Sequence, residues 1–263
     1  MKCCICGTVR NCEKYLQNVF NNMEKIATLF DEYVILLYYD NSDDNTLQII
    51  QNYQKINNHL VYYINTDPII FSWNTRTFNI AKGRNWCINT IKCFYSNYDY
   101  FIMMDCDDVC SNDINIDVLS KSLLRDDWDS LSFNRKNYYD LWALSIYPYI
   151  HSCLHFNIGQ FNGVDITKRN FNQILSKTPK NSLIKCYSAF CGFAIYKTNK
   201  FLNCNYDSKC RLDLLPNDVL EKYLNLVKNI TNSLHVDCEH RSFHYEAIKL
   251  NNARIRISPE FLF

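Results

Sequence analysis

The sequence predicts an α/β protein with a mostly parallel central sheet flanked by helices, because strand-like and helix-like patterns alternate along its first 105 residues. Apolar runs typical of strands occur at 2–9, 33–39, 61–64 and about 98–105. Between the first two, Leu16, Val19, Phe20 and Met23 recur at three- and four-residue steps, which indicates an amphipathic helix. Parallel strands need crossover connections, so this alternation favours a doubly wound parallel sheet.

The elements follow in a clear order up to Asp105. The run 33–39 is apolar on both faces, as expected of a central parallel strand. Polar residues 40–46 turn the chain and offer a cap for a helix over 47–56. After the third strand, a loop over about 65–75 leads to a helix that carries Ile80, Arg84, Ile88 and Ile91.

Beyond Val109 the pattern is less regular. Strands are predicted at 129–133, 188–196 and 253–257, and helices at 219–226 and from 238 to about 251. Residues 138–150 are rich in aromatic side chains. No internal repeat or low-complexity linker interrupts the chain, so a single domain over 1–263 is the simplest prediction.

Composition restricts the classes of function. The chain has 263 residues, of which 48% are hydrophobic and 21% charged, as in ordinary folded proteins. A net charge of +1 gives no bulk attraction for nucleic acid or anionic membranes. No apolar run approaches the ~20 residues of a membrane span, and residues 1–11 lack the apolar core of a signal peptide.

Fourteen cysteines without a secretory signal indicate free thiols in a reducing compartment, so we expect a cytoplasmic protein. Asn, Lys, Ile and Tyr are plentiful while glycine and proline are scarce, with five residues each. This bias suggests an AT-rich coding genome, such as that of a large DNA virus or a protist. For a viral protein, the expected location is the host cytoplasm.

The segment 98–109 is the most informative in the chain, because a buried strand ends there in Asp105, Asp107 and Asp108. Ligands of open α/β sheets bind at the carboxyl ends of the strands, and hard cations such as Mg²⁺ and Mn²⁺ prefer oxygen ligands. A cation held there would neutralise a diphosphate. The alternative is a polar turn with solvated acids and a helix cap.

Three other residues are candidates for binding a ligand near the ends of the strands. Asp40 follows the second strand, where its carboxylate is placed to accept hydrogen bonds from a nucleobase or ribose; the alternative is that it only starts the turn. Arg84, early in a helix, is a candidate to pair with a diphosphate or to hold the Asp105 cluster. Arg10 ends the first strand and is a second candidate. A solvated helix face is the alternative for Arg84.

The carboxyl-terminal half contributes candidate acids and bases. Glu239 begins the last helix, where the helix dipole favours a carboxylate, so it is either a general base or only a helix-start acid. His240 and His244 share a helix face, which suits a metal site or simple packing. Asp140 lies among aromatics at 138–142, a composition that suits a sugar ring or a protein core.

Taken together, these segments resemble the nucleotide-sugar glycosyltransferases of the GT-A fold. The resemblance extends in order over nearly the whole chain. The closest branch is the fungal capsular mannosyltransferase-like one, with related glycosyltransferases of large DNA viruses, which the segments Tyr139–Trp142 and Cys238–His244 together resemble. The segments that carry the resemblance are Val9–Asn11, Asp40–Thr46, Gly83–Asn85, the DxD-like Asp105–Asp107, Cys191–Tyr196, Cys238–His240 and Arg254–Glu260.

The resemblance implies a Rossmann-like sheet in which residues 1–109 form the donor half. Residues 110–263 would form a smaller, mixed acceptor half. It implies donor contacts from Val9, Arg10, Asp40, Arg84, Asp105 and Cys106, with Asp40 at the base and Asp105 near the ribose or sugar. Asp107 would ligate Mn²⁺ or Mg²⁺. Glu239 would be the base of an inverting displacement.

The sequence departs from the family pattern at two places. His240 replaces the second acid of the usual Glu-Asp pair, which leaves Glu239, His240 and Asp140 as alternative bases. No histidine follows the last strand, so His244 is the nearest candidate for a histidine ligand of the metal.

We therefore expect a metal-dependent hexosyltransferase that uses a UDP- or GDP-sugar. The acceptor would be the hydroxyl of a glycan, glycoprotein or lipid-linked molecule. Three alternatives stay open: a sugar-phosphate nucleotidyltransferase, a non-catalytic nucleotide- or carbohydrate-binding module of the same fold, and a structural or interaction protein. The first usually has a glycine- and arginine-rich phosphate loop, and Gly7 is the only glycine near the first strand.

Overall fold

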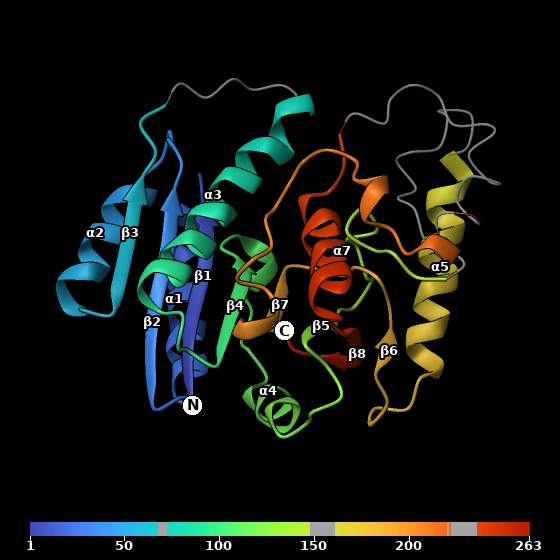
Figure 1. The fold of residues 1–263 in the computed structure, drawn as a ribbon. Helices are drawn as coiled ribbons and strands as arrows, with labels where there is room; N and C mark the ends of the chain where they lie inside the picture. The colour runs from blue at the N-terminus through green and yellow to red at the C-terminus, as the bar shows by residue number, and fades with distance from the viewer. Residues whose placement is uncertain (68–72, 148–160, 220, 222–235) are drawn as a thin grey trace. The chain divides into compact units, whose positions relative to one another are not determined.

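The computed structural model describes residues 1–67, 73–147, 161–219, 221 and 236–263 (Figure 1). The chain divides into two compact units. Unit 1 consists of Met1–Arg125, Gly192–Leu202 and Leu262–Phe263. Unit 2 consists of Asp126–Cys191 and Asn203–Phe261.

Unit 1 contains a mostly parallel sheet, as predicted. Its strands lie in the order β3-β2-β1-β4-β7. The first four are parallel to one another, and β7 runs antiparallel to β4. The strands are β1 (Lys2–Val9), β2 (Glu32–Tyr39), β3 (Leu60–Ile64), β4 (Tyr100–Asp105) and β7 (Phe193–Lys197).

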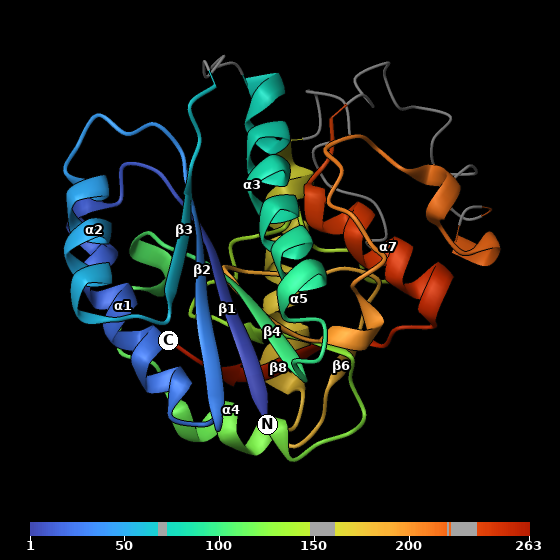
Figure 2. The ribbon, with the colours of Figure 1, turned by 60° about the vertical axis from the view of Figure 1, so that its left-hand side comes forward.

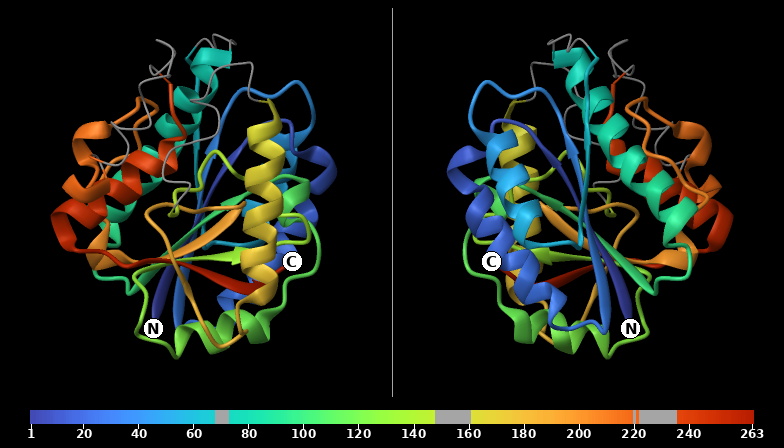
Figure 3. Two further views of the ribbon diagram at one scale, coloured as in Figure 1. Left: turned by 90° about the vertical axis from the view of Figure 1, so that its right-hand side faces the viewer. Right: turned by 90° about the vertical axis from the view of Figure 1, so that its left-hand side faces the viewer.

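Helices cover both faces of this sheet. Helices α1 and α2 lie on one face and α3 lies on the other (Figures 2 and 3). The stripe predicted for α1 is confirmed, since Leu16, Val19, Phe20 and Met23 are fully buried. The helical elements of unit 1 are α1 (Glu13–Ala27), α2 (Thr46–Ile56), α3 (Trp73–Phe94), α4 (Ile116–Leu123) and the short 3₁₀ helices η1 (Asp108–Cys110) and η4 (Thr198–Lys200).

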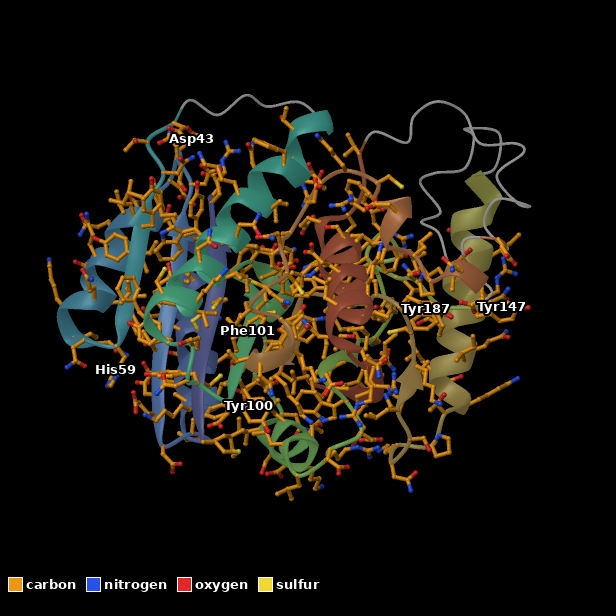
Figure 4. All side chains as sticks on the ribbon, in the orientation of Figure 1. Asp43, His59, Tyr100, Phe101, Tyr147 and Tyr187 are labelled. Atoms are coloured by element: carbon orange, nitrogen blue, oxygen red, sulfur yellow. The ribbon has the colours of Figure 1, made fainter. Side chains whose placement is uncertain are left out.

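The central strands are buried on both faces because their side chains are almost all apolar. Cys3, Cys4 and Cys6 in β1 are completely buried and act as small hydrophobic residues. No cysteine in the described part of the chain forms a disulfide. The two ends of the parallel strands can be told apart in Figure 4: Asp43 lies at their carboxyl ends and Tyr100 at their amino ends.

Unit 2 has a smaller, mixed set of strands in the order β5-β8-β6. Strands β5 and β8 are parallel, and β6 runs antiparallel to β8. This agrees with the mixed carboxyl-terminal portion that was predicted. The elements are β5 (Ser130–Asn134), α5 (Phe161–Lys177), β6 (Ile184–Lys185), η5 (Leu212–Leu214), α7 (Glu239–Asn251) and β8 (Ile255–Phe261).

Two predicted strands differ from the structure in their boundaries. The strand predicted at 188–196 begins only at Phe193, because Cys191 (φ 58°) and Gly192 (φ 86°) have left-handed backbones that interrupt an extended chain. The last strand begins at Ile255 and continues to Phe261. Most of the helix predicted at 219–226 lies outside the described residues. None of the helices in the described ranges is long and apolar enough to cross a membrane.

Candidate functional site

The carboxyl ends of β2, β1 and β4 meet at one edge of the sheet in unit 1. Strand β1 lies between the other two, and its register pairs Val9 with Tyr39 and Thr8 with Asp105. The N–H of Asp40 donates to the carbonyl of Val9 (2.9 Å), which fixes the start of the loop after β2. Val9, Asp40 and Asp105 therefore lie at the same edge, as their positions in the sequence predicted.

The loops after β1 and β2 are joined by hydrogen bonds. The N–H of Asn11 donates to Ser42 Oγ (3.0 Å), and Asn11 Oδ1 accepts from the N–H of Asp43 (2.8 Å). Asp44 Oδ2 accepts from the N–H of Glu13 at the start of α1 (3.0 Å). Asp44 therefore has a structural role in the acid-rich loop, while Asp40 remains at the strand end.

Arg10 belongs to the same pair of loops. Its Nε donates to the carbonyl oxygen of Asn41 (3.1 Å), so the side chain reaches from the end of β1 to the loop after β2. Because Asn41 directly follows Asp40, this bond holds the positive charge of Arg10 close to the strand ends.

Asp40 lies in a polar cluster that includes two residues not predicted from the sequence. Asn65 Nδ2 donates to Asp40 Oδ1 (2.8 Å), and Lys82 Nζ donates to Asn65 Oδ1 (3.2 Å). Lys82 also forms an ion pair with Asp67. The available signal was position: Asn65 directly follows the third strand, and Lys82 lies two residues before Arg84 in α3.

Arg84 and Asp105 form an ion pair at this edge. Arg84 Nη2 lies 3.1 Å from Asp105 Oδ1, with side-chain exposures of 6% and 25%. The preceding Gly83 lets α3 pack closely on the sheet, since a Cβ there would lie 2.7 Å from both Thr8 Cγ2 and Tyr38 Cδ1. The close approach of α3 brings Arg84 to the end of β4.

In the DxD-like segment the two acids are partly exposed, whereas the middle residue is buried. Cys106 is only 2% exposed, and burial raises the pKa of its thiol well above the usual range. A donor contact from Cys106 would therefore come from its backbone. Asp107 Oδ1 accepts from the N–H of Val109 (3.0 Å) and caps η1, whereas Asp108 is exposed.

The donor set at this segment fits a hard divalent cation, because Asp105 and Asp107 offer carboxylate oxygens, the ligands that Mg²⁺ and Mn²⁺ prefer. Within the described ranges, no group of three or more His, Cys, Asp or Glu side chains is placed to hold a metal ion. Mg²⁺ commonly binds one or two carboxylates and takes its other ligands from substrate phosphates and water, so the two acids of this segment are compatible with such a cation.

In unit 2, the first seven residues of α7, 239–245, are all buried. Glu239 is 3% exposed and His240 is 1% exposed. Glu239 Oε1 lies 3.9 Å from His240 Nε2. The ring of His240 stacks on Phe190, with 3.8 Å between ring centroids. For a carboxylate in general, burial favours the protonated form, whereas the dipole at a helix amino terminus favours the charged form.

A buried ion pair anchors the start of α7. Arg241 Nε donates to Asp237 Oδ2 (3.0 Å), and both side chains are 4% exposed. Arg241 Nη1 also donates to the carbonyl of Leu144 (2.9 Å), and the N–H of Cys238 donates to Asp237 Oδ1 (2.8 Å). These contacts fix the backbone on which Glu239 is presented, and neither Asp237 nor Arg241 was predicted from the sequence.

His244 is completely buried, and its Nδ1 lies 2.9 Å from Ser188 Oγ. A hydrogen bond of this kind at one ring nitrogen fixes the ring orientation, as also occurs for histidines that ligate metals through the other nitrogen. The geometry of His244 therefore suits both of the roles that the sequence left open.

Asp140 forms hydrogen bonds with the backbone through both carboxylate oxygens. Oδ1 accepts from the N–H of Ala143 (3.1 Å), and Oδ2 accepts from the N–H of Cys191 (3.3 Å). Arg135 Nε donates to the carbonyl of the same Cys191 (2.9 Å). Asp140 and Arg135 thus hold Cys191 in its left-handed conformation directly before Gly192.

The predicted site residues form two sets, one in each unit. Unit 1 holds Val9, Arg10, Asp40, Arg84, Asp105, Cys106 and Asp107, and unit 2 holds Asp140, Glu239, His240 and His244. The first set shares one edge of a parallel sheet. In the second set, Glu239, His240 and His244 come from the first two turns of α7, and Asp140 comes from the loop after β5.

The fold is similar to that of solved nucleotide-sugar glycosyltransferases. Staphylococcus aureus TarS, residues 1–349, matches all of this chain with a TM-score of 0.52 and 14% identity, over 59% of its own chain. The same fragment in complex with UDP-GlcNAc gives a TM-score of 0.52 at 15% identity, over 57% of its chain. The chain thus spans little more than half of these fragments, and at such identities the likeness is one of fold.

A third structure, the mannosyltransferase PcManGT from Pyrobaculum calidifontis in complex with GDP-Man and Mn²⁺, gives a TM-score of 0.48 at 10% identity. That match covers 97% of this chain and 56% of PcManGT. No curated protein gives a significant sequence match. The family model for glycosyl transferase family 2, however, matches residues 4–197. That match includes every predicted donor-side residue and most of the chain, and the protein is therefore a member of glycosyl transferase family 2.

Proposed function

We propose that this family member is a metal-dependent hexosyltransferase that moves a sugar from a nucleotide-diphospho-sugar to an acceptor hydroxyl with inversion. The observation that carries the proposal is the grouping of Asp40, Arg84, Asp105 and Asp107 at one edge of the unit 1 sheet. Ligands of open α/β sheets bind at this edge. The acids at this edge can bind a metal ion and a ribose, and the guanidinium of Arg84 can pair with a diphosphate.

Each donor-side residue has a distinct proposed contact. Asp40 accepts hydrogen bonds from the nucleobase, and Asn65 orients its carboxylate. Arg84 pairs with the diphosphate while its bond to Asp105 keeps the guanidinium in place. Arg10 adds positive charge at the same edge. Val9 and Cys106 are buried, so they contribute through the backbone.

Asp107, with Asp105 beside it, is proposed to hold Mn²⁺ or Mg²⁺. When bound, the cation offsets the negative charge that develops on the departing diphosphate. A role for His244 as a further ligand stays a prediction. It would use Nε2, because Nδ1 faces Ser188.

Glu239 is the proposed base. As the acceptor oxygen bonds to the anomeric carbon, its proton passes to the Glu239 carboxylate, and the bond between the anomeric carbon and the diphosphate oxygen breaks. The nucleoside diphosphate leaves with the bonding electrons. His240, at 3.9 Å from Glu239, is an alternative proton acceptor. We give Asp140 a positioning role, because both of its oxygens accept backbone N–H groups. A retaining transferase would not need the base.

A UDP- or GDP-sugar is the proposed donor. The complex of TarS with UDP-GlcNAc makes UDP-GlcNAc the first compound to test on a chain of the same fold. A glycan, glycoprotein or lipid-linked molecule is the proposed acceptor. The free thiols of the described cysteines support a reducing location such as the cytoplasm.

A thermal-shift screen of UDP-, GDP-, CMP- and dTDP-sugars, each with and without Mn²⁺, tests the proposal directly. A ligand that binds only the native state raises the melting temperature by mass action. We expect one nucleotide class to stabilise the protein only when Mn²⁺ is present. Release of the nucleoside diphosphate in the presence of candidate acceptors then measures turnover.

The outcomes separate the alternatives. Metal-dependent stabilisation with turnover supports the transferase. Stabilisation without hydrolysis or transfer under any condition favours the non-catalytic binding module. No stabilisation by any nucleotide sugar favours a structural or interaction role.

A further inference from the structure

Gly7 lies next to the DxD-like segment, in the middle of the sheet. It pairs with Met104 in the register of β1 and β4. A Cβ at position 7 would lie 2.4 Å from Cys106 Sγ, 3.3 Å from the Met104 carbonyl oxygen and 3.4 Å from Leu37 Cδ2. Gly7 is not among the residues with positive φ, so space and not backbone conformation requires glycine here.

The thiol of Cys106 occupies the room that this glycine leaves. Cys106 is 2% exposed, while Asp105 and Asp107 on either side are partly exposed. The middle residue of the segment is thus packed into the protein, and the two acids beside it stay at the surface of the sheet edge. The depth to which Cys106 can enter sets where the two acids lie.

The burial of Cys106 restricts how this contact can be relieved. Real Cβ atoms essentially never approach another heavy atom more closely than 3.0 Å, so an added methyl group would have to move Cys106 Sγ outward from 2.4 Å. The cysteine side chain has one rotatable bond and is surrounded by protein. Because the space around the thiol is filled, we expect part of its displacement to be taken up by the backbone that connects Asp105 to Asp107.

We propose that Gly7 and Cys106 form a steric pair in which Gly7 is a positioning residue for the metal- and diphosphate-binding acids Asp105 and Asp107. This inference rests on the proposed function, since it assigns these acids to donor binding. Misplacing binding groups by about 1 Å can reduce a rate by about 100-fold. We therefore expect a methyl group at position 7 to impair donor binding and transfer without removing any polar contact.

The test is a double-mutant cycle with G7A, C106A and G7A/C106A. The readouts are the Mn²⁺-dependent affinity for the nucleotide that stabilises the wild type, by calorimetry, and the kcat and KM for transfer. We expect G7A to lower kcat/KM by about 100-fold, from the misplacement effect above, and to weaken Mn²⁺-dependent binding. In the C106A background the same G7A substitution should cause almost no further loss, because removal of Sγ clears the space.

A second pair of variants covers the case in which G7A does not fold. Cys106→Val adds bulk from the other side of the contact with Gly7 intact, and Cys106→Ser keeps the size of the thiol. We expect the valine variant to bind the nucleotide with Mn²⁺ more weakly than the serine variant. Circular dichroism and urea denaturation of each variant report whether a loss of binding accompanies a native fold.

The outcomes that overturn the inference are distinct. Wild-type affinity in folded G7A, or a G7A loss that is equally large in the C106A background, excludes the steric pair while leaving the proposed function intact. Equal affinity of the valine and serine variants also excludes it. If the wild type itself shows no Mn²⁺-dependent nucleotide binding, the proposed function fails, and the inference fails with it.

Discussion

Arg84 Nη2 lies 3.1 Å from Asp105 Oδ1, although the two residues are 21 positions apart in the chain and belong to different elements. The guanidinium is almost fully buried, and the carboxylate is partly exposed. Asp105 therefore neutralises part of the charge of Arg84 and holds its guanidinium in one orientation. Because the side chain is already ordered, binding of an anionic ligand loses little of its conformational entropy. This relationship links the α3 helix to the end of β4.

Replacing Arg84 with glutamine should weaken binding of a nucleoside diphosphate by about 10- to 100-fold, since a hydrogen bond to a charged group contributes about 1.5–3 kcal/mol. Calorimetric titration with UDP or GDP in the presence of Mn²⁺ measures this change. Lys92→Gln is the matched control, because it removes one positive charge from the exposed far end of the same helix. Equal affinities for the two variants would refute the role of Arg84.

Gly83→Ala should destabilise the fold even though alanine favours helices. The added Cβ would lie 2.7 Å from Thr8 Cγ2 and Tyr38 Cδ1, so α3 would have to move away from β1 and β2. Overpacking of this kind costs about 1–3 kcal/mol, against a gain of up to about 1 kcal/mol in helix propensity. Urea denaturation should show a net loss of unfolding free energy, whereas Lys92→Ala on the same helix should cause almost none.

The donor-side edge could be predicted from the sequence because local patterns determine it. The apolar runs before Asp40 and Asp105 are long enough to be central strands, and parallel strands in adjacent positions end at the same edge. The order of polar residues after each strand then places both acids together. The family resemblance added the assignment of Asp107 as the metal ligand, which spacing alone does not show.

Other features depend on contacts that no local pattern encodes. Asp140 reaches Cys191 across 51 residues, and their hydrogen bond accompanies the left-handed backbone that delays the start of β7. Arg241 reaches Leu144 across 97 residues. A charged residue in a helix ordinarily predicts an exposed face, so the complete burial of the first turns of α7 could not be predicted from its composition.

The contribution of Asp44 to the stability of the fold should depend on pH. Partial burial acts to raise the pKa of its carboxyl, but hydrogen bonds from Thr46 and from the N–H of Glu13 outweigh it and hold the pKa below its usual range. Stability from such a group is fully present above its unfolded pKa of about 4 and is lost as pH falls through the lower folded pKa.

Asp44→Ala should therefore lower the urea midpoint at pH 7, and the gap to the wild type should narrow as the pH is lowered towards 2. Asp43→Ala is the control, because Asp43 is exposed and adjacent. A gap that does not change with pH would show that the ionised carboxylate of Asp44 is not the source of stability.

Asp107→Asn should abolish the Mn²⁺ dependence of nucleotide binding. An amide keeps the size of the side chain and an oxygen that can accept from Val109, but it lacks the negative charge that attracts a hard cation. The exposed neighbour Asp108 provides the control Asp108→Asn. Thermal shifts with and without Mn²⁺ measure the effect, and an unchanged manganese response in Asp107→Asn would rule out this residue as the ligand.

Glu239→Gln and Asp140→Asn together identify the base. If Glu239 accepts the proton, its glutamine variant should keep donor affinity and lose about 100- to 10,000-fold in kcat, because the amide cannot take up a proton. Asp140→Asn removes at most one of the two hydrogen bonds from backbone N–H groups, which weakens the turn at Cys191. It should therefore lower the free energy of unfolding and leave the pH dependence of kcat unchanged. Near-normal turnover in Glu239→Gln would favour a retaining route or His240. A shifted pH profile in Asp140→Asn would instead transfer the role of base to Asp140, because a residue that only holds the backbone has no titration to contribute.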